Sequence, residues 1–403
     1  SCWGLSWAIS AFITFTKEIY RGKQEDLLEF ITTHTGYDAI LVHFPVAPLI
    51  TAVLDAALKG IQDCPIIAWL HGFETEAWHR HSFNFLTTTE ETTAALERRT
   101  KHFPQHLNHM RSLYTRTDVD VSFVNVSAWF QEAIVEPDAK TRIARSAVIP
   151  NVIDRGTFGY RAKSPDLRYK VLSLRPYASS KYANDLTAAA IHEAAGKPWF
   201  DKFEFTIAGD GVLFESITEP LKKYPNVTVR QGFFNHTEIR ELHANHGIFL
   251  SPTRFDSQGV SACEAMASGL VPLSTNTASI PEFITDGETG LLAPLNNYRK
   301  LVEHLETLHE DPELFARLSA NASASMAKLC GKQAATWEEI RYIRQRIAEH
   351  PNYQDHHAEA TAALASIDWE ARYRELENQT ALIVAETNRI RRKIETQATN
   401  QER

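Results

Sequence analysis

Two carboxylates, those of Asp256 and Glu264, stand eight positions apart and could hold hydroxyl groups at the two ends of a diphosphate-linked ligand. Asp256 follows a short apolar run, residues 247–250, which ends in Ser-Pro and is typical of a buried parallel strand. A helix is expected to begin near Gly259 and to carry Glu264 about one and a half turns further on. The two acids should therefore lie on different sides of the turn that joins strand and helix.

The turn itself offers a site for an anion. The first turn of a helix exposes backbone N–H groups and the positive end of the helix dipole. We therefore expect free amides at Gln258, Gly259 and Val260 to suit a phosphate, with Ser257 in the same donor-binding loop.

A second group with matching chemistry follows a strand predicted over residues 169–174. Arg175 and Lys181 flank a polar loop at the end of this strand. One forked and one point-charge donor together suit a diphosphate. Solvated basic side chains without a ligand are the competing interpretation.

Single turns supply the remaining candidates. Gly209 and Gly211 follow one predicted strand and Gly232 follows the next, although a lone Gly-x-Gly is a weak signal. His71 ends a strand predicted over 65–70, and ligands of open α/β sheets bind outside the carboxyl ends of strands. A purely structural histidine is the competing interpretation there. The sequence contains neither a Gly-x-Gly-x-x-Gly fingerprint nor a Walker loop.

The elements that must position these residues alternate between strand and helix, which indicates parallel sheets covered by helices. Helices are expected over 24–33, 47–59 and within 79–111, and strands over 39–43, 65–70, 119–126, 169–174, 203–208, 227–232 and 247–250. After Pro294 the pattern is helical, with helices predicted over 297–309, 312–329 and from Thr336 onward.

The two ends of the chain show different patterns. Residues 1–15 are apolar but shorter than a membrane span, and are expected to form a buried helix. The first clear strand comes only after them, so the chain is either a fragment or has an abridged first domain. The tail from Ile367 carries a polar heptad seam, which fits a helix packed on its own protein and a self-association helix equally well.

Composition excludes several classes of protein. With 43% hydrophobic and 23% charged residues, the 403-residue chain is globular rather than disordered. A net charge of -8 gives no support for a nucleic-acid partner. The four cysteines are scattered without a C-x-x-C pair, which favours neither zinc nor disulfides and predicts a cytoplasmic protein.

The segment around Asp256 resembles the C-terminal signature of retaining GT-B glycosyltransferases of family 4, Glu-x7-Glu, with Asp256 where the first glutamate is common. Residues 270–274 and 280–292 continue the resemblance in order and spacing, and 148–154 resembles the hinge between the two domains of that family. The family's usual Arg…Lys-Gly pair differs here, because Tyr182 follows the lysine and the loop is one residue longer.

The resemblance implies an α/β fold of the GT-B type, with two facing Rossmann-like domains and a C-terminal helical tail. It implies an acceptor-side domain over 1–154 that lacks its first strand, a nucleotide-sugar domain over 155–330, a crossover helix over 331–350 and a tail over 351–403.

It further implies retaining, metal-independent and cofactor-free transfer of a hexosyl group from a nucleotide-diphosphate sugar to a glycan, lipid or other hydroxyl acceptor, in polysaccharide biosynthesis. Glu264 would hold the ribose, Asp256 the sugar, and Arg175 with Lys181 the leaving diphosphate. His71 would lie near the acceptor or the reacting sugar, and the turn at Gly232 would pack against the base.

Two other functions stay open on the sequence alone: a catalytically silent interaction protein on the same fold, and a nucleotide-sugar 2-epimerase. Self-association and peripheral contact with the inner face of a membrane also stay open.

Overall fold

The computed structural model describes residues 24–43, 45, 47–72, 74–75, 105–140, 142–143 and 145–351. The helix expected over 1–15, most of the helical stretch expected within 79–111 and the heptad tail lie outside the described residues.

The first sheet contains four parallel strands in the order β1 (Ile40–His43), β2 (Ile66–Leu70), β3 (Val121–Asn125) and β4 (Ser146–Val148). Every residue of β2 and β3 is buried. Burial on both faces explains why β2 reads as a continuous apolar run, whereas β3 also buries the polar residues Ser122 and Asn125. Three helices accompany this sheet: α1 (Gln24–Thr33), α2 (Ala47–Leu58) and a helix over 105–114. A π-helix, η2 (Phe130–Val135), leads into α4 (Glu136–Ala139).

The second sheet contains six parallel strands, and its order reverses once. The strands are β5 (Lys170–Leu174), β6 (Glu204–Gly209), β7 (Val227–Gln231), β8 (Ile248–Leu250), β9 (Val271–Thr275) and β10 (Leu291–Ala293), in the order β10-β9-β8-β5-β6-β7. The chain moves outward from β5 to β7 and then restarts at β8 on the other side of β5. Ligands of doubly wound sheets bind where the order reverses, so the loops after β5 and β8 are the positions of interest.

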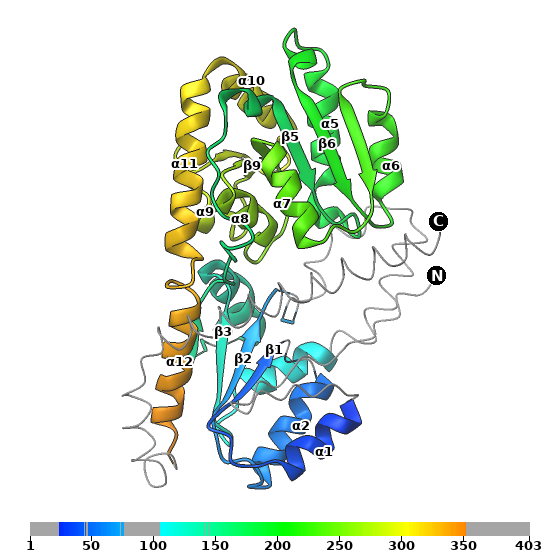
Figure 1. Ribbon diagram of the computed structural model, residues 1–403. Helices are drawn as coiled ribbons and strands as arrows, with labels where there is room; N and C mark the ends of the chain where they lie inside the picture. Colours follow the sequence, from blue (N-terminus) through cyan, green and yellow to red (C-terminus); the bar gives the residue numbers. More distant parts are fainter. Residues whose placement is uncertain are drawn as a thin grey trace, which may run out of the picture. The chain divides into compact units, whose positions relative to one another are not determined.

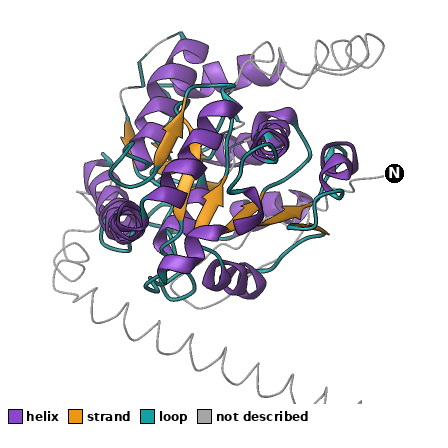
Figure 2. Cartoon of the chain, turned by 90° about the horizontal axis from the view of Figure 1, so that it is seen from above, coloured by secondary structure: helices purple, strands orange, loops and turns teal. Residues whose placement is uncertain are grey.

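Helices cover both faces of the second sheet (Figures 1 and 2). One apolar cluster joins the sheet to α5 (Asn184–Ala194), α6 (Phe214–Thr218) and α10 (Tyr298–Glu310). Another joins it to α7 (His236–Asn245), α8 (Val260–Ala267) and α9 (Ile280–Phe283). Helix α11 (Pro312–Leu329) contributes buried residues to both clusters. Two packed layers on a buried sheet hold the strand ends rigidly, which is what a site built on loops requires.

Polar side chains cap the N-termini of helices α7, α10 and α11. Asn235 accepts hydrogen bonds from the amides of Thr237 and Glu238, and Glu238 completes a capping box at the start of α7. Asn297 caps α10 and Asp311 caps α11.

Helix α12 (Thr336–Glu349) is the last described helix. Short 3-10 turns lie at η3 (Pro165–Tyr169), η4 (Ser180–Tyr182), η5 (Phe200–Lys202) and η6 (Glu219–Leu221).

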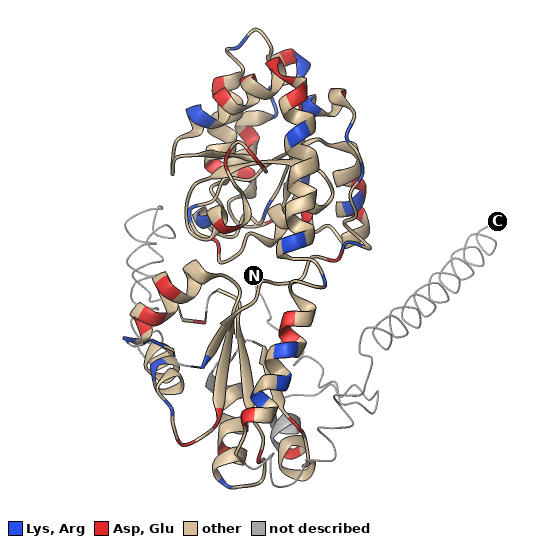
Figure 3. Ribbon diagram, turned by 90° about the vertical axis from the view of Figure 1, so that its left-hand side faces the viewer, with Lys and Arg blue, Asp and Glu red and all other residues tan. Residues whose placement is uncertain are grey.

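The predicted elements agree closely with those observed. The helices expected over 24–33 and 312–329 have these bounds, and the strand expected over 39–43 spans Ile40–His43. Figure 3 shows acidic and basic residues interspersed along the described helices. Among the described residues, no helix combines the length and apolar character of a membrane span.

Candidate functional site

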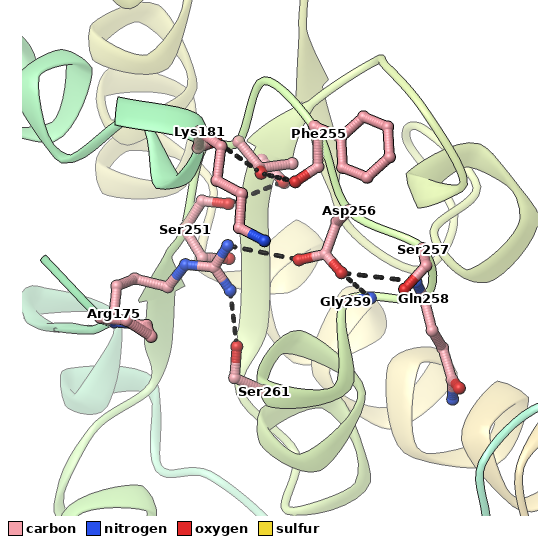
Figure 4. A network of polar contacts seen from close by, with 12 residues as sticks. Arg175, Lys181, Ser251, Phe255, Asp256, Ser257, Gln258, Gly259 and Ser261 are labelled. Atoms are coloured by element: carbon pink, nitrogen blue, oxygen red, sulfur yellow. Dashed lines mark hydrogen bonds and ion pairs between the residues drawn. The ribbon is translucent and has the colours of Figure 1, made fainter. Parts of the chain in front are cut away.

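Arg175 follows β5 and extends into the site with its side chain almost fully buried. Its Nη1 donates to Ser261 Oγ at 2.7 Å, and its Nη2 lies 3.4 Å from Asp256 Oδ2 (Figure 4). The Nε of this guanidinium has no hydrogen-bond partner among the described residues. A buried charged donor without a partner is costly, so this N–H suits an acceptor supplied by a ligand.

Two glycines at the carboxyl end of β6, Gly209 and Gly211, determine how Arg175 is held. Gly209 and Gly211 have φ angles of 144° and 143°. A Cβ on Gly209 would lie 1.9 Å from the carbonyl oxygen of Arg175, and one on Gly211 would lie 2.3 Å from the carbonyl carbon of Tyr177. These two glycines therefore permit the close approach of the loop that carries Arg175. The donor-binding role predicted for these two glycines stays a prediction. The packing supports an indirect role, in which they position the loop that carries Arg175.

Lys181 lies in the short turn η4 that follows the Arg175 loop. The side chain of Ser179 accepts a hydrogen bond from the Lys181 amide at 3.2 Å. The Tyr182 ring lies 4.9 Å from Lys181 Nζ and 5.0 Å from the Arg175 guanidinium carbon. Figure 4 shows the Lys181 ammonium directed toward Arg175 and Asp256, so the two predicted diphosphate-binding residues do come together.

Asp256 folds its carboxylate back onto the turn in front of α8. Its Oδ1 accepts hydrogen bonds from the amide of Gly259 at 2.7 Å and from that of Gln258 at 3.3 Å. A neighbouring carboxylate therefore occupies both amides here, and the phosphate contact predicted for Gln258 and Gly259 stays a prediction. The amide of Val260, the first residue of α8, is left as the predicted anion donor.

Gly259 is the N-cap of α8 and adopts a left-handed φ of 77°. Such a φ is costly for residues with a Cβ, and a Cβ here would also lie 2.9 Å from Ile280 Cδ1. The predicted start of the helix near Gly259 is confirmed.

Glu264 lies inside α8, as predicted, and is half-buried. Burial raises the pKa of its carboxyl from 4.5 to about 7. No hydrogen bond or ion pair between this carboxyl and another described residue offsets the desolvation. An acceptor of this kind suits hydroxyl donors brought by a ligand.

The side chains of Ser257 and Gln258 are engaged by other parts of the protein. Ser257 Oγ donates to the carbonyl oxygen of His71 at 2.5 Å. Gln258 is buried, and its Oε1 accepts from the backbone and side-chain nitrogens of Asn151 at 2.8 and 2.7 Å. Its Nε2 donates to the Asn151 carbonyl oxygen at 3.1 Å. These residues hold the loop in place, and the ligand contact predicted for them stays a prediction.

His71 follows β2 and pairs with a histidine that the sequence analysis did not select. His43 Nδ1 lies 3.0 Å from His71 Nε2, and the two rings stack. Burial, and next the proximity of His43, lower the pKa of His71 to about 4, against a hydrogen bond with Asn151 that raises it. His71 is therefore a neutral imidazole near pH 7. A sequence signal for His43 existed, because one strand ends in His43 and the adjacent parallel strand is followed by His71, which places both side chains at one edge of the sheet.

The backbone at His71 is fixed by Glu74, which is not among the predicted site residues. The buried carboxylate of Glu74 accepts from the amides of His71 and Gly72 at 2.9 and 2.8 Å. The turn after β2 is thereby held by charge-assisted hydrogen bonds.

Gly232 directly follows β7 and has a φ of 151°, and its amide donates to the Gly209 carbonyl oxygen at 3.0 Å. The next residue, Phe233, is 92% exposed. An aromatic ring this exposed at the carboxyl end of a strand is a candidate surface for a planar ligand group. Among the described residues, no group of three or more His, Cys, Asp or Glu side chains is arranged to hold a metal ion.

Comparison with known proteins agrees with this geometry. Residues 165–325 match the family model described as glycosyl transferases group 1, which confirms the resemblance noted in the sequence. An uncharacterised 41.2 kDa protein in the cps region of Klebsiella pneumoniae is 35% identical over 112 residues, which are 27% of this chain and 30% of that protein. Such matches span about a third or less of the curated relatives' own length.

Solved structures resemble the chain over more of its length. Sucrose-phosphate synthase from Thermosynechococcus elongatus superposes with a TM-score of 0.63 at 16% identity, over 81% of this chain and 77% of that one. The Anabaena protein HepE, solved in complex with UDP and glucose, superposes with a TM-score of 0.56 at 17% identity, over 81% and 80%. The predicted fold class, an α/β fold of the GT-B type with two Rossmann-like domains, is confirmed.

Proposed function

We propose that this protein transfers a hexosyl group from a nucleotide-diphosphate sugar to a hydroxyl group of a glycan, lipid or other acceptor, with retention of configuration and without a metal ion. The observation that carries the proposal is the buried guanidinium of Arg175, whose Nε lacks a partner among the described residues, beside Asp256 at the reversal point of the sheet. The match of residues 165–325 to glycosyl transferases group 1 supports it.

In the proposed reaction, the bond between the sugar carbon and the diphosphate oxygen breaks and its electron pair leaves with the diphosphate. The charge on that oxygen grows as the bond lengthens. Arg175 and Lys181 stabilise this charge from fixed positions, which lowers the barrier more than it strengthens ground-state binding.

The acceptor hydroxyl attacks the same face of the sugar and passes its proton to the departing phosphate oxygen. A double displacement would need a carboxylate nucleophile within reach of the sugar carbon. The Asp256 carboxylate is held by Gly259, Gln258 and Arg175, and Glu264 is assigned to the ribose. The same-face route therefore fits these residues better than a covalent intermediate does.

The remaining residues orient the donor. Glu264 accepts hydrogen bonds from the two ribose hydroxyls, and Asp256 accepts from a hydroxyl of the sugar with the oxygen that faces Arg175. His71 is neutral, so it contributes a hydrogen bond rather than a charge to the reacting sugar. The exposed ring of Phe233, next to Gly232, packs against the base.

We propose the domain division that the sequence suggests. Residues 1–154 form the acceptor-side domain, 155–330 the nucleotide-sugar domain and 331–350 the crossover helix. The six-stranded sheet, which lies within 155–330, carries Arg175, Lys181, Asp256 and Glu264, and this supports the assignment of donor binding to that part.

The test begins with the donor. Nucleoside diphosphates and hexose nucleotides of uracil, guanine, adenine, cytosine and thymine are screened for an increase in Tm, because a ligand of the native state stabilises it by mass action. UDP-glucose is the first probe, since HepE was solved with UDP and glucose. The nucleotide sugar that stabilises the protein most is then incubated with candidate acceptors, and the anomeric configuration of the product is read by NMR.

The expected result is stabilisation by one nucleotide and transfer that EDTA does not inhibit. Absence of both stabilisation and transfer across the whole panel would contradict the proposal. The comparisons favour transfer over a silent interaction protein and over 2-epimerisation, and a free epimer released without transfer would reverse that preference.

A further inference from the structure

Arg254 lies between β8 and α8, and its guanidinium is almost fully engaged by the protein itself. Nη1 donates to the Ser180 carbonyl oxygen and to Asp185 Oδ1, both at 2.7 Å. Nη2 donates to Asp185 Oδ2 at 2.6 Å, and Nε donates to Asn296 Oδ1 at 2.9 Å. Four of the five N–H groups of an arginine are thereby used. The Arg254 side chain is 14% exposed, whereas the Asp185 side chain that it binds is 49% exposed, so the ion pair is partly open to water.

The backbone next to this side chain binds the same loop. The Arg254 amide donates to the Lys181 carbonyl oxygen at 2.7 Å, and Thr253 Oγ1 donates to that oxygen at 3.1 Å. The carbonyl groups of Ser180 and Lys181 are both satisfied by residues 253–254, more than 70 positions further along the chain. The loop after β8 therefore clamps the turn that carries Lys181.

The turn that carries Lys181 depends on such contacts from outside. It is a single 3-10 turn of three residues, and it ends at Ala183 in a left-handed conformation with φ 49°. A non-glycine residue in that region costs roughly 1–2 kcal/mol. Tyr182 stands where the resembled family has glycine, in a loop one residue longer, so this turn depends more on contacts from outside.

We propose that Arg254 is a positioning residue for Lys181, holding the lysine where its ammonium meets the leaving diphosphate. The inference rests on the proposed function and extends it to a residue that does not touch the donor. Direct phosphate binding by Arg254 fits poorly, because at most one N–H is left over, whereas Arg175 has a buried Nε without a partner among the described residues. A lysine at position 254 could not reproduce the role, since one ammonium cannot bind a carboxylate in two places and also reach an amide and a carbonyl.

The decisive experiment compares single and double variants. Arg254→Met keeps the aliphatic stem and removes the four side-chain hydrogen bonds. With the nucleotide sugar identified by the donor screen, we expect kcat to fall about tenfold or more while affinity for the matching nucleoside stays within about twofold of wild type. Lys181→Met supplies the reference, and the double variant Arg254→Met/Lys181→Met should be no more than about twofold slower than Lys181→Met alone. Losses that multiply would overturn the inference, because they would show that Arg254 acts independently of Lys181.

Two further variants test the same role of Arg254 if Arg254→Met folds poorly. Asp185→Asn removes the negative charge that holds the Arg254 guanidinium but preserves the size of the side chain. Arg254→Lys preserves the positive charge but removes the forked guanidinium. Both should lower kcat with little change in nucleoside affinity. Arg299→Met is the matched control, because the Arg299 side chain is 67% exposed and its Nε lies 3.8 Å from Glu193 Oε1. It should behave as wild type.

The outcomes separate the two proposals. A wild-type protein that neither binds a nucleoside diphosphate nor transfers sugar would end the proposed function and this inference with it. A wild type that transfers sugar, a Lys181→Met variant with impaired turnover and an Arg254→Met variant with wild-type kcat would end only the inference.

Discussion

Asp256 Oδ1 lies 2.7 Å from the amide nitrogen of Gly259, so the acid expected to bind a sugar also closes the turn in front of α8. The Gln258 amide donates to the same oxygen at 3.3 Å, and Arg175 approaches the other oxygen at 3.4 Å. A carboxylate thus lies where a phosphate was expected. When a donor binds, one of two things must happen. Either Asp256 stays in place and the phosphate contacts the next amides of α8, or the phosphate displaces the Asp256 carboxylate.

Asp256→Asn separates these two contributions. The amide side chain retains an oxygen for Gly259 and loses the charge that faces Arg175. We expect unfolding free energy within about 1 kcal/mol of wild type and a clear loss of transfer. Asp256→Ala should lose transfer too, with a further stability loss of about 1 kcal/mol because the turn loses its acceptor. Thermal unfolding and transfer rates measure both, and wild-type turnover in Asp256→Asn would refute a role of the charge.

Asp256→Glu restores the acid that is common in the resembled family. The longer side chain should crowd a turn fitted to aspartate and lower activity. Transfer of the same sugar at an undiminished rate would show that the shorter acid carries no specificity for the sugar.

Glu264 should make stability depend on pH. Burial raises the pKa of its carboxyl from 4.5 to about 7, so its contribution to stability is fully present below pH 4.5 and is lost as pH rises through 7. We expect Glu264→Gln to be more stable than wild type by roughly 1–3 kcal/mol at pH 8 and to show no such gain at pH 4.5. Chemical unfolding at the two pH values measures this. Glu215→Gln, on an exposed position of α6, is the control, and an equal effect of both substitutions would rule out the burial argument.

Donor affinity should rise with pH, whereas the contribution of Glu264 to stability falls with pH. The ribose hydroxyls favour the ionised carboxylate, so binding lowers the pKa of Glu264 and affinity falls as pH drops below about 7. A nucleotide sugar is the right ligand for this titration, because its diphosphate does not titrate near pH 7. Calorimetry should show this dependence in wild type and a flatter profile in Glu264→Gln. Identical profiles would exclude contact between Glu264 and the ribose.

Arg175→Ala and Lys181→Ala should lower turnover more than they weaken nucleoside binding. Their positive charge opposes the charge that develops on the leaving diphosphate, so its removal acts mainly on the transition state. Steady-state kinetics and nucleoside titrations of each variant measure the difference. If kcat and nucleoside affinity fell by the same factor, the two residues would not be directed at the leaving group.

Phe233→Ala should weaken nucleotide binding without destabilising the fold. The ring is 92% exposed and contributes little to the core, whereas stacking on a base is worth about 1–3 kcal/mol. The Kd of the nucleoside diphosphate should rise about fivefold or more, and Tm should not change. Leu58→Ala, at an exposed position of α2, is the control for loss of surface apolar area. An unchanged Kd in Phe233→Ala would place the base elsewhere.

The sequence by itself determined the elements and the strand ends at which the site lies. Apolar runs ending in polar turns placed Arg175 after one strand and Asp256 after another, and parallel strands bring such ends to one edge. The start of α8 at Gly259 and the position of Glu264 inside it also followed from local pattern, since capping and helical spacing act over a few residues.

The tertiary structure alone decided which groups those side chains meet. Gln258 binds Asn151 across 107 positions, and Arg254 binds Asp185 across 69. Asp256 binds the Gly259 amide over only three positions, but its approach to Arg175 spans 81 positions. Hydrogen bonds of this kind form between loops that packed helices and sheets bring together, so residue type and spacing predict the donors and acceptors but not their pairing.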